Sequence, residues 1–346
     1  MAAGGERVIG VLQAGRALAA LAVLTYHAAY ATHDFAAPLS PGVFHASEQG
    51  TYGVDFFFVL SGFIILHAHE DDPRGRHAAG RYLRKRLTRI FVPYLPVSLA
   101  MIGLYLALPG VSGSARDWSL LTSLTLIPTG SPPALAAAWT LQHEMIFYVI
   151  FLASYAVRGF PVFAAWVGLI LIGISLGYRA DYAAPTWANA FAAINLEFVF
   201  GMLACRAARV ASPRWAPLCL ALGAAGLTAY FALGIDPVGP WRPLLGLVLA
   251  LLVLGGVLLE RAGHIAVPGW LILTGNASYA IYLVHAPLAS LAARVMGKLG
   301  TPGGWPASVA LCVALGIAAG LIYHLAYERP ALALARGRFS RRMAVQ

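Results

Sequence analysis

The chain has 346 residues, of which 60% are hydrophobic and only 11% are charged. A soluble domain of this size carries about 25% charged residues, so the composition excludes an ordinary soluble fold. The net charge of +10 comes from basic residues in short loops, which orient a membrane protein and argue against nucleic-acid binding.

Apolar segments long enough to cross a membrane recur along the whole chain, since about 20 apolar residues span a hydrocarbon layer of about 30 Å. We predict ten transmembrane helices, at about residues 9–30, 52–69, 90–108, 138–157, 162–178, 188–206, 215–234, 243–259, 270–294 and 305–327. Arg16 interrupts the first apolar segment, which favours a retained helix over a cleaved signal peptide. The prediction is an all-α polytopic protein whose residues 1–346 form one membrane domain without a separate soluble domain.

The distribution of Lys and Arg predicts the orientation. With the N-terminus inside, 18 of the 24 basic residues fall in cytoplasmic segments and 5 in outer segments. This bias predicts that both termini are cytoplasmic.

The three cysteines show no paired spacing. Cys205, Cys219 and Cys312 all fall in or beside apolar segments, and the chain contains neither C-x-x-C nor H-E-x-x-H. We therefore expect no disulfide framework and no metal site.

Ionisable residues inside the predicted spans are the clearest signs of function, because they are costly in a membrane and need a partner or a task. Arg16 and His27 are eleven residues apart, which is about 1100° of helical rotation, so both face the same way about 16 Å apart along the axis. His27, Asp55, Glu144 and His285 fall in the outer halves of four different spans. We expect them to converge on a polar site that opens toward the outer face.

A purely structural reading stays open, because intramembrane polar side chains also hold helices together by hydrogen bonds. We interpret His143, His324 and Glu197 as structural or of unknown role. The remaining histidines lie in loops or at span ends, where we expect them to be solvated: His33, His45, His67, His69, His77 and His264.

A basic segment precedes the third span, at residues 81–93. It can be ordinary positive-inside charge, or it can bind phosphate. Arg86 and Arg89 are three residues apart and share a face if the segment is helical, and an Arg fork binds phosphate with two hydrogen bonds. A cytoplasmic cofactor with several phosphates would fit there.

Six stretches carry a resemblance to a known family. They are Gln13–His27, Gly53–Phe63, Arg86–Pro93, Trp139–Tyr148, Gly275–Pro287 and Tyr327–Pro330, in that order along the chain. Over nearly its whole length the chain resembles the acyltransferase-3 family of multi-pass membrane acyltransferases. The stretch from Trp139 to Tyr148 looks most like the branch that acetylates bacterial exopolysaccharides, although that branch often has Asn-Tyr where this chain has Gln142-His143.

The resemblance implies an O-acyltransferase that moves an acetyl or other short acyl group from acyl-CoA to a hydroxyl of an exported or lipid-linked glycan. The family's Arg-to-His motif falls on Arg16 and His27, and its Arg-x-x-Arg motif, associated with the acyl-CoA donor, falls on Arg86 and Arg89. The resemblance also implies that no cofactor is bound permanently, that acyl-CoA, the glycan and membrane lipid are the partners, and that the protein lies in a bacterial cytoplasmic (inner) membrane.

We expect His27 to take the proton from the sugar hydroxyl, with Asp55 or Glu144 orienting its imidazole. Arg16 is expected to contact the pantetheine arm or the thioester oxygen. His285, together with Trp139 and Tyr148 from the motif, is predicted to contact substrate or support the site.

Two other classes of function stay open at this stage. A proton-coupled transporter of a small polar solute also needs buried carboxylates and histidines, but the chain shows no internal repeat. A non-catalytic membrane sensor is the third class. The acyl group, the acceptor sugar, a possible acyl-enzyme step and the oligomeric state cannot be read from the residues.

Overall fold

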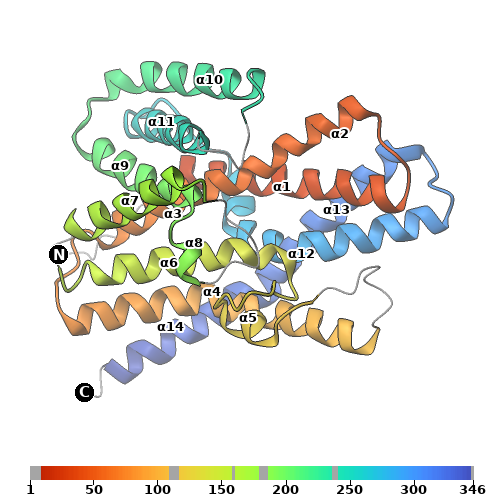
Figure 1. The fold of residues 1–346 in the computed structure, drawn as a ribbon, viewed down its shortest axis with the longest axis horizontal. Helices are drawn as coiled ribbons and strands as arrows, with labels where there is room; N and C mark the ends of the chain where they lie inside the picture. Colours follow the sequence, from red (N-terminus) through yellow and green to blue (C-terminus); the bar gives the residue numbers. More distant parts are fainter. Residues whose placement is uncertain (1–8, 109–116, 158–159, 179–185, 236–240, 344–346) are drawn as a thin grey trace.

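The computed structural model describes residues 9–108, 117–157, 160–178, 186–235 and 241–343, which form helices and no strand (Figure 1). The long helices are α1 (Gly10–Phe35), α3 (Gly53–His69), α4 (Arg76–Ala107), α6 (Trp139–Ala153), α7 (Phe160–Ser175), α9 (Leu196–Val210), α10 (Ala216–Ala232), α11 (Arg242–Arg261), α12 (Gly269–Lys298) and α13 (Gly304–Tyr323). The other helical elements are α2 (Pro41–Glu48), α5 (Leu120–Thr125), α8 (Thr186–Asn189), η1 (Gln49–Tyr52), η2 (Ala136–Ala138), η3 (Ala193–Asn195), η4 (Pro213–Trp215), η5 (His324–Glu328) and α14 (Arg329–Met343).

Each of the ten predicted spans overlaps one of the long helices, although α4 begins well before its predicted span and α9 begins only at Leu196, eight residues into its own. Among the described residues, seven helical segments are long and apolar enough to cross a membrane. They contain α3, α4, α6, α10, α11, α12 and α13. The predicted all-α polytopic membrane fold is confirmed, while the count of ten spans stays a prediction, because α1, α7 and α9 do not meet that measure. Large apolar side chains such as Leu106, Leu222 and Ile322 are exposed on the outside of the bundle, as expected of a surface that faces lipid.

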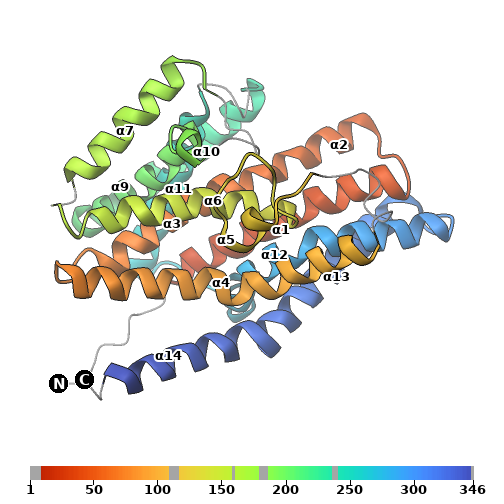
Figure 2. The same ribbon diagram turned by 60° about the horizontal axis from the view of Figure 1, so that its bottom comes forward.

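The ends of several helices gather at one end of the bundle. The turn from α3 to α4, the end of α6 and the C-terminal end of α14 lie on the left of Figures 1 and 2. This end carries the basic segment that the orientation rule assigns to the cytoplasm. Sidedness itself stays a prediction, and four residues that entered the charge count, Arg7, Arg116, Arg158 and Arg179, lie outside the described residues.

Helix α1 packs along α12, and the two approach closely because α12 has glycine at both ends of the contact. A Cβ at Gly275 would lie 2.1 Å from the Gln13 carbonyl oxygen, and one at Gly297 would lie 2.0 Å from that of Phe35. Small residues at such positions let two membrane helices pack backbone to backbone. This contact sets the relative positions of His27 on α1 and His285 on α12.

Helix α4 begins at Arg76, well before the predicted span, so the basic segment forms its first turns. The helix has 32 residues and continues past Pro93 and Pro96. Pro96 has no amide to pair with the carbonyl of Val92, and the hydroxyl of Tyr327 donates to that oxygen at 3.2 Å instead. Arg86 and Arg89 therefore share one face of a continuous helix, as the segment's spacing predicts.

Candidate active site

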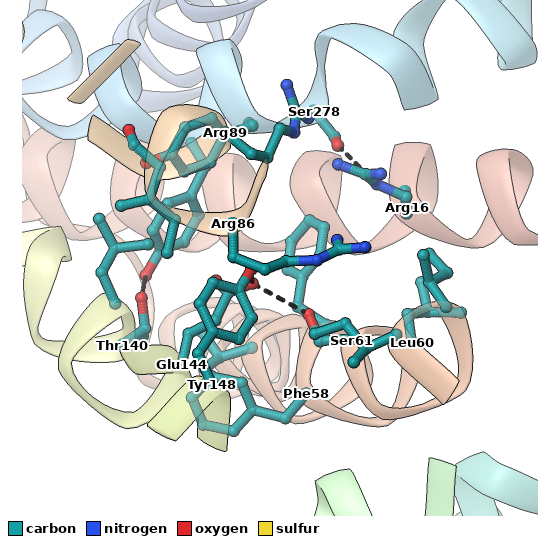
Figure 3. A pocket seen from close by; sticks show the side chains of 18 residues that line it. Arg16, Phe58, Leu60, Ser61, Arg86, Arg89, Thr140, Glu144, Tyr148 and Ser278 are labelled. Atoms are coloured by element: carbon teal, nitrogen blue, oxygen red, sulfur yellow. Dashed lines mark hydrogen bonds between the residues drawn. The ribbon is translucent and has the colours of Figure 1, made fainter. Parts of the chain in front are cut away.

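A pocket that is partly open to solvent lies among α1, α3, α4, α6 and α12. Its charged lining residues are Arg16, Arg86, Arg89 and Glu144. They come from three helices that are far apart in sequence, and Figure 3 shows them around one space. Three guanidinium groups and one carboxylate line the pocket, an excess of positive charge that favours an anionic ligand over a cationic one.

Two of the predicted catalytic residues lie in this pocket and are held by hydroxyl groups. Arg16 Nε donates to Ser278 Oγ at 3.2 Å (Figure 3). Glu144 Oε1 accepts from the Tyr148 hydroxyl at 2.5 Å and from Ser61 Oγ at 3.4 Å. The predicted support residue Tyr148 therefore fixes the carboxylate of Glu144.

Arg89 has a carboxylate partner from the C-terminal part of the chain. It donates to Glu328, which is fully buried on η5, and its guanidinium lies over the ring of Tyr279 at 5.4 Å from the centroid. His324 Nδ1 lies 2.8 Å from the other oxygen of Glu328. The charge of Arg89 is therefore balanced within the protein.

His27 and His285 form a pair next to the pocket. His285 Nε2 lies 3.2 Å from His27 Nδ1, and the two rings meet edge to face with centroids 4.7 Å apart. The ring of His285 also lies against Tyr282, with centroids 5.4 Å apart, and Tyr282 lines the pocket. Tyr282 thus contacts the histidine pair on one side and the pocket on the other.

The hydrogen-bond partners of the two histidines define their tautomers. His285 Nδ1 lies 2.6 Å from the carbonyl oxygen of Tyr282, so it carries the hydrogen and Nε2 is an acceptor. His27 Nδ1 lies 2.9 Å from the carbonyl oxygen of Val23 and also faces this acceptor nitrogen. Because both neighbours accept, His27 Nδ1 carries the hydrogen, and Nε2 keeps the lone pair that a general base needs.

Asp55 lies elsewhere, in a buried ion cluster. Its Oδ1 is 2.7 Å from Arg242 Nη2, and Arg242 Nε donates to Glu197 Oε1 at 3.4 Å. The side chains of Asp55 and Glu197 are 2% and 0% exposed. Neither Asp55 nor Glu144 is a hydrogen-bond partner of His27 in the described part of the chain, and His285 occupies the place predicted for an orienting carboxylate.

The structure thus separates the predicted site residues into three groups and leaves Trp139 outside them. Arg16, Glu144, Tyr148, Arg86 and Arg89 line the pocket. His27 pairs with His285, and Asp55 joins Arg242 and Glu197. Trp139 packs against His143, with ring centroids 5.8 Å apart, and is not among the residues that line the pocket.

Several pocket residues were not predicted individually. Ser278, Tyr279 and Tyr282 lie inside the stretch 275–287, and Ser278, Tyr282 and His285 have the i, i+4, i+7 spacing of one helix face. That spacing, counted back from His285, could have identified Ser278 and Tyr282. The expectation that His69 is solvated is wrong, because its side chain is only 2% exposed. Glu328 gave no separate signal, since no periodicity connects it to Arg89.

Comparison with known proteins adds independent information. The family described as "Acyltransferase domain" matches residues 9–324. The chain is 30% identical over 322 residues to "Exopolysaccharide production protein ExoZ" of Rhizobium meliloti (strain 1021), covering 86% of this chain and 96% of that protein. It is 26% identical over 359 aligned positions to "Acyltransferase MdmB" of Streptomyces mycarofaciens, covering 92% and 90%. No solved structure matches the chain.

Proposed function

The chain belongs to the acyltransferase family that matches residues 9–324, and we propose that it moves an acetyl or other short acyl group from acyl-CoA to a hydroxyl of an exported or lipid-linked glycan. The observation that supports this most directly is the adjacency of two sites of different chemistry. One is a pocket with three arginines, suited to an anionic donor, and the other is the His27–His285 pair with a free basic nitrogen.

The donor fits the pocket through its phosphates. Coenzyme A carries several phosphate groups, and Arg forks bind phosphate with paired hydrogen bonds. We assign the phosphate contacts to Arg86 and Arg89, which lie on the helix whose first turns form the predicted cytoplasmic end. Arg16 lies about 16 Å along the α1 axis from His27, a distance that an extended pantetheine arm covers. We assign Arg16 to that arm, which would have to pass Tyr282 to bring its thioester to His27.

The reaction then needs one base. His27 Nε2 takes the proton of the acceptor hydroxyl while the hydroxyl oxygen attacks the thioester carbon. The carbon–sulfur bond breaks, the thiolate of CoA leaves, and it takes the proton back from His27. The products are an ester and free CoA, with no net release of protons. His285 holds the ring of His27 in the tautomer that leaves Nε2 free.

The name of the relative from Rhizobium meliloti supports a polysaccharide acceptor, and that of the Streptomyces relative supports acyl transfer. A polarity from a phosphate-binding end to a base in the opposite half of the membrane suits a donor made in the cytoplasm and an acceptor that is exported. We accordingly propose a bacterial cytoplasmic membrane as its location.

The test is release of free CoA from acetyl-CoA by purified protein, with and without candidate polysaccharides. Wild type should release CoA in an acceptor-dependent manner, and His27→Ala should reduce the rate by about 10²–10⁴-fold. His45→Ala is the matched control, because His45 is exposed on α2 and pairs with the nearby Glu48. Full activity of His27→Ala would contradict the assignment of the base, and transport of a solute without any CoA release would favour a transporter.

A further inference from the structure

A chain of four side chains runs through the predicted cytoplasmic end of the bundle and ends at Arg86. The Tyr155 hydroxyl donates to Asp72 Oδ2 at 2.7 Å, and His69 Nδ1 lies 2.8 Å from the same oxygen. His69 Nε2 lies 2.5 Å from Arg86 Nη2. The four residues come from the end of α3, the turn that follows it, the third turn of α4 and the residues after α6, so these hydrogen bonds connect α3, α4 and the end of α6.

The hydrogen positions in this chain follow from what each group can donate. Arginine has no acceptor, so His69 Nε2 must accept from Arg86. The hydrogen of the neutral ring is therefore on Nδ1, which donates to Asp72. A His69 that carried both hydrogens could not accept from Arg86 and would repel it.

Arg86 and Arg89 have partners of different charge. Arg89 donates to the carboxylate of Glu328, which balances its charge. Arg86 is held by a neutral imidazole, so its position is fixed while its full charge is kept. The guanidinium carbon of Arg86 also lies 5.9 Å from the centroid of the Tyr82 ring, and this contact adds no negative charge.

Arg86 also retains hydrogen-bonding capacity that the protein does not use. Its Nε is buried and has no hydrogen-bond partner among the described residues, and its side chain lines the pocket with Arg16 and Glu144 (Figure 3). A buried N–H without a partner costs free energy unless a ligand supplies an acceptor. An anionic oxygen of a molecule that fills the pocket would supply this acceptor.

We propose that His69 is a positioning residue that aims Arg86 at a phosphate of the donor, and that Asp72 fixes the tautomer in which His69 can do this. The proposal rests on the proposed function, because the phosphate is that of acyl-CoA. It adds that Arg86, which has no direct carboxylate partner among the described residues, supplies positive charge for that phosphate, while the charge of Arg89 is already balanced by Glu328.

Two substitutions of similar polarity separate positioning from folding. The amide oxygen of His69→Gln lies near the place of Nε2 and can accept from Arg86. The amide group of His69→Asn lies near the place of Nδ1, so it can donate to Asp72 but cannot reach Arg86. His67→Asn, at an exposed position one half-turn earlier on α3, is the control for an asparagine at this end of the helix.

The measurements are the KM for acetyl-CoA, the kcat, and the Kd for free CoA, made on the full-length protein in detergent. We expect His69→Asn to raise KM and Kd about tenfold, the effect of one lost hydrogen bond to a charged group, while kcat changes by less than about twofold. His69→Gln and His67→Asn should keep the wild-type KM and Kd.

Two results would overturn the proposal while leaving the acyltransferase function intact. One is a wild-type KM and Kd for His69→Asn. The other is an equal loss of CoA affinity in His69→Gln and His69→Asn when both elute as folded protein, which would show that the position only supports the fold. If wild type itself neither binds CoA nor releases it from any acyl-CoA, the proposed donor is wrong, and so is the role proposed for His69.

Discussion

Arg242 holds two buried carboxylates, and its replacement should reveal whether this cluster supports the fold. The guanidinium contacts Asp55 on α3 at 2.7 Å and Glu197 on α9 at 3.4 Å, and its own side chain is 16% exposed. Arg242→Leu removes the shared cation while leaving both acids in place. Because α3, α9 and α11 meet at this cluster, the loss should act on the packing of all three helices.

The magnitude follows from the burial of the partners. The side chains of both acids are at most 2% exposed, so each must either remain as an uncompensated charge or take up a proton. Breaking a buried ion pair by removing one partner costs about 3–5 kcal/mol. At about 2 °C per kcal/mol for a large domain, this predicts a fall of roughly 6–10 °C in the midpoint of thermal unfolding.

The assay is the fraction of protein that still elutes as a monodisperse species after heating in detergent. Arg214→Leu is the matched control, because Arg214 is exposed, and substitutions at such surface positions change stability by about 0.5 kcal/mol or less. An unchanged midpoint for Arg242→Leu would refute the reasoning that this cluster supports the fold.

The same preparations test the catalytic role predicted for Asp55. Since Asp55 contacts Arg242 rather than His27, we expect Asp55→Asn to lower the unfolding midpoint and to change the kcat of the folded fraction by less than about tenfold. A loss of about 10²-fold in kcat at wild-type stability would instead support orientation of His27 by this carboxylate.

Three further predictions concern helix contacts and the histidine pair. His285→Asn removes the ring nitrogen that accepts from His27 but leaves the carbonyl oxygen of Val23 as an acceptor, so kcat should fall only about five- to tenfold. His285→Gln should keep the wild-type kcat. A loss in kcat as large as that of His27→Ala would mean that His285 contacts the reacting atoms. A Cβ at Gly201 would lie 1.9 Å from the carbonyl oxygen of Val59, so Gly201→Ala should separate α3 from α9 and lower the stability by about 1–3 kcal/mol. The heating assay measures this loss, and wild-type stability of the variant would contradict the close contact. The carboxylate of Glu260 accepts from the first two amides of α1 at 2.7 Å each. Glu260→Ala should therefore lower the free energy of unfolding by about 2 kcal/mol, and Glu260→Gln should lower it less. Equal stability of the two variants would refute a capping role.

The helices could be predicted because each apolar segment is long enough to be recognised from its composition. The residues of the candidate site could be predicted only in part. Arg16 and Glu144 were identified as ionisable groups in apolar segments and do line one pocket. Asp55 was identified by the same rule, yet its partner is Arg242, because the rule locates a charged side chain along a helix without giving the direction in which that helix presents it.

Contacts that depend on tertiary structure were not accessible from the sequence. Depth estimates brought His27 and Asp55 to the same level of the membrane, but only the packing of α1 on α12 shows that His285 is the neighbour of His27. His69 stands at the end of an apolar helix, where solvation is the usual expectation. It is buried because the turn after α3 folds back and brings Asp72 to it.

The measurement that tests the account most directly is transfer of an isotope-labelled acetyl group from acetyl-CoA to glycan in membranes that contain the protein. Wild-type membranes should yield labelled glycan whose label is released by mild alkali, as expected of an ester. His27→Ala should reduce this label by at least about 10²-fold with the protein present at the same level. Equal labelling by His27→Ala would contradict the account, and so would movement of glycan across the membrane without any transfer of label.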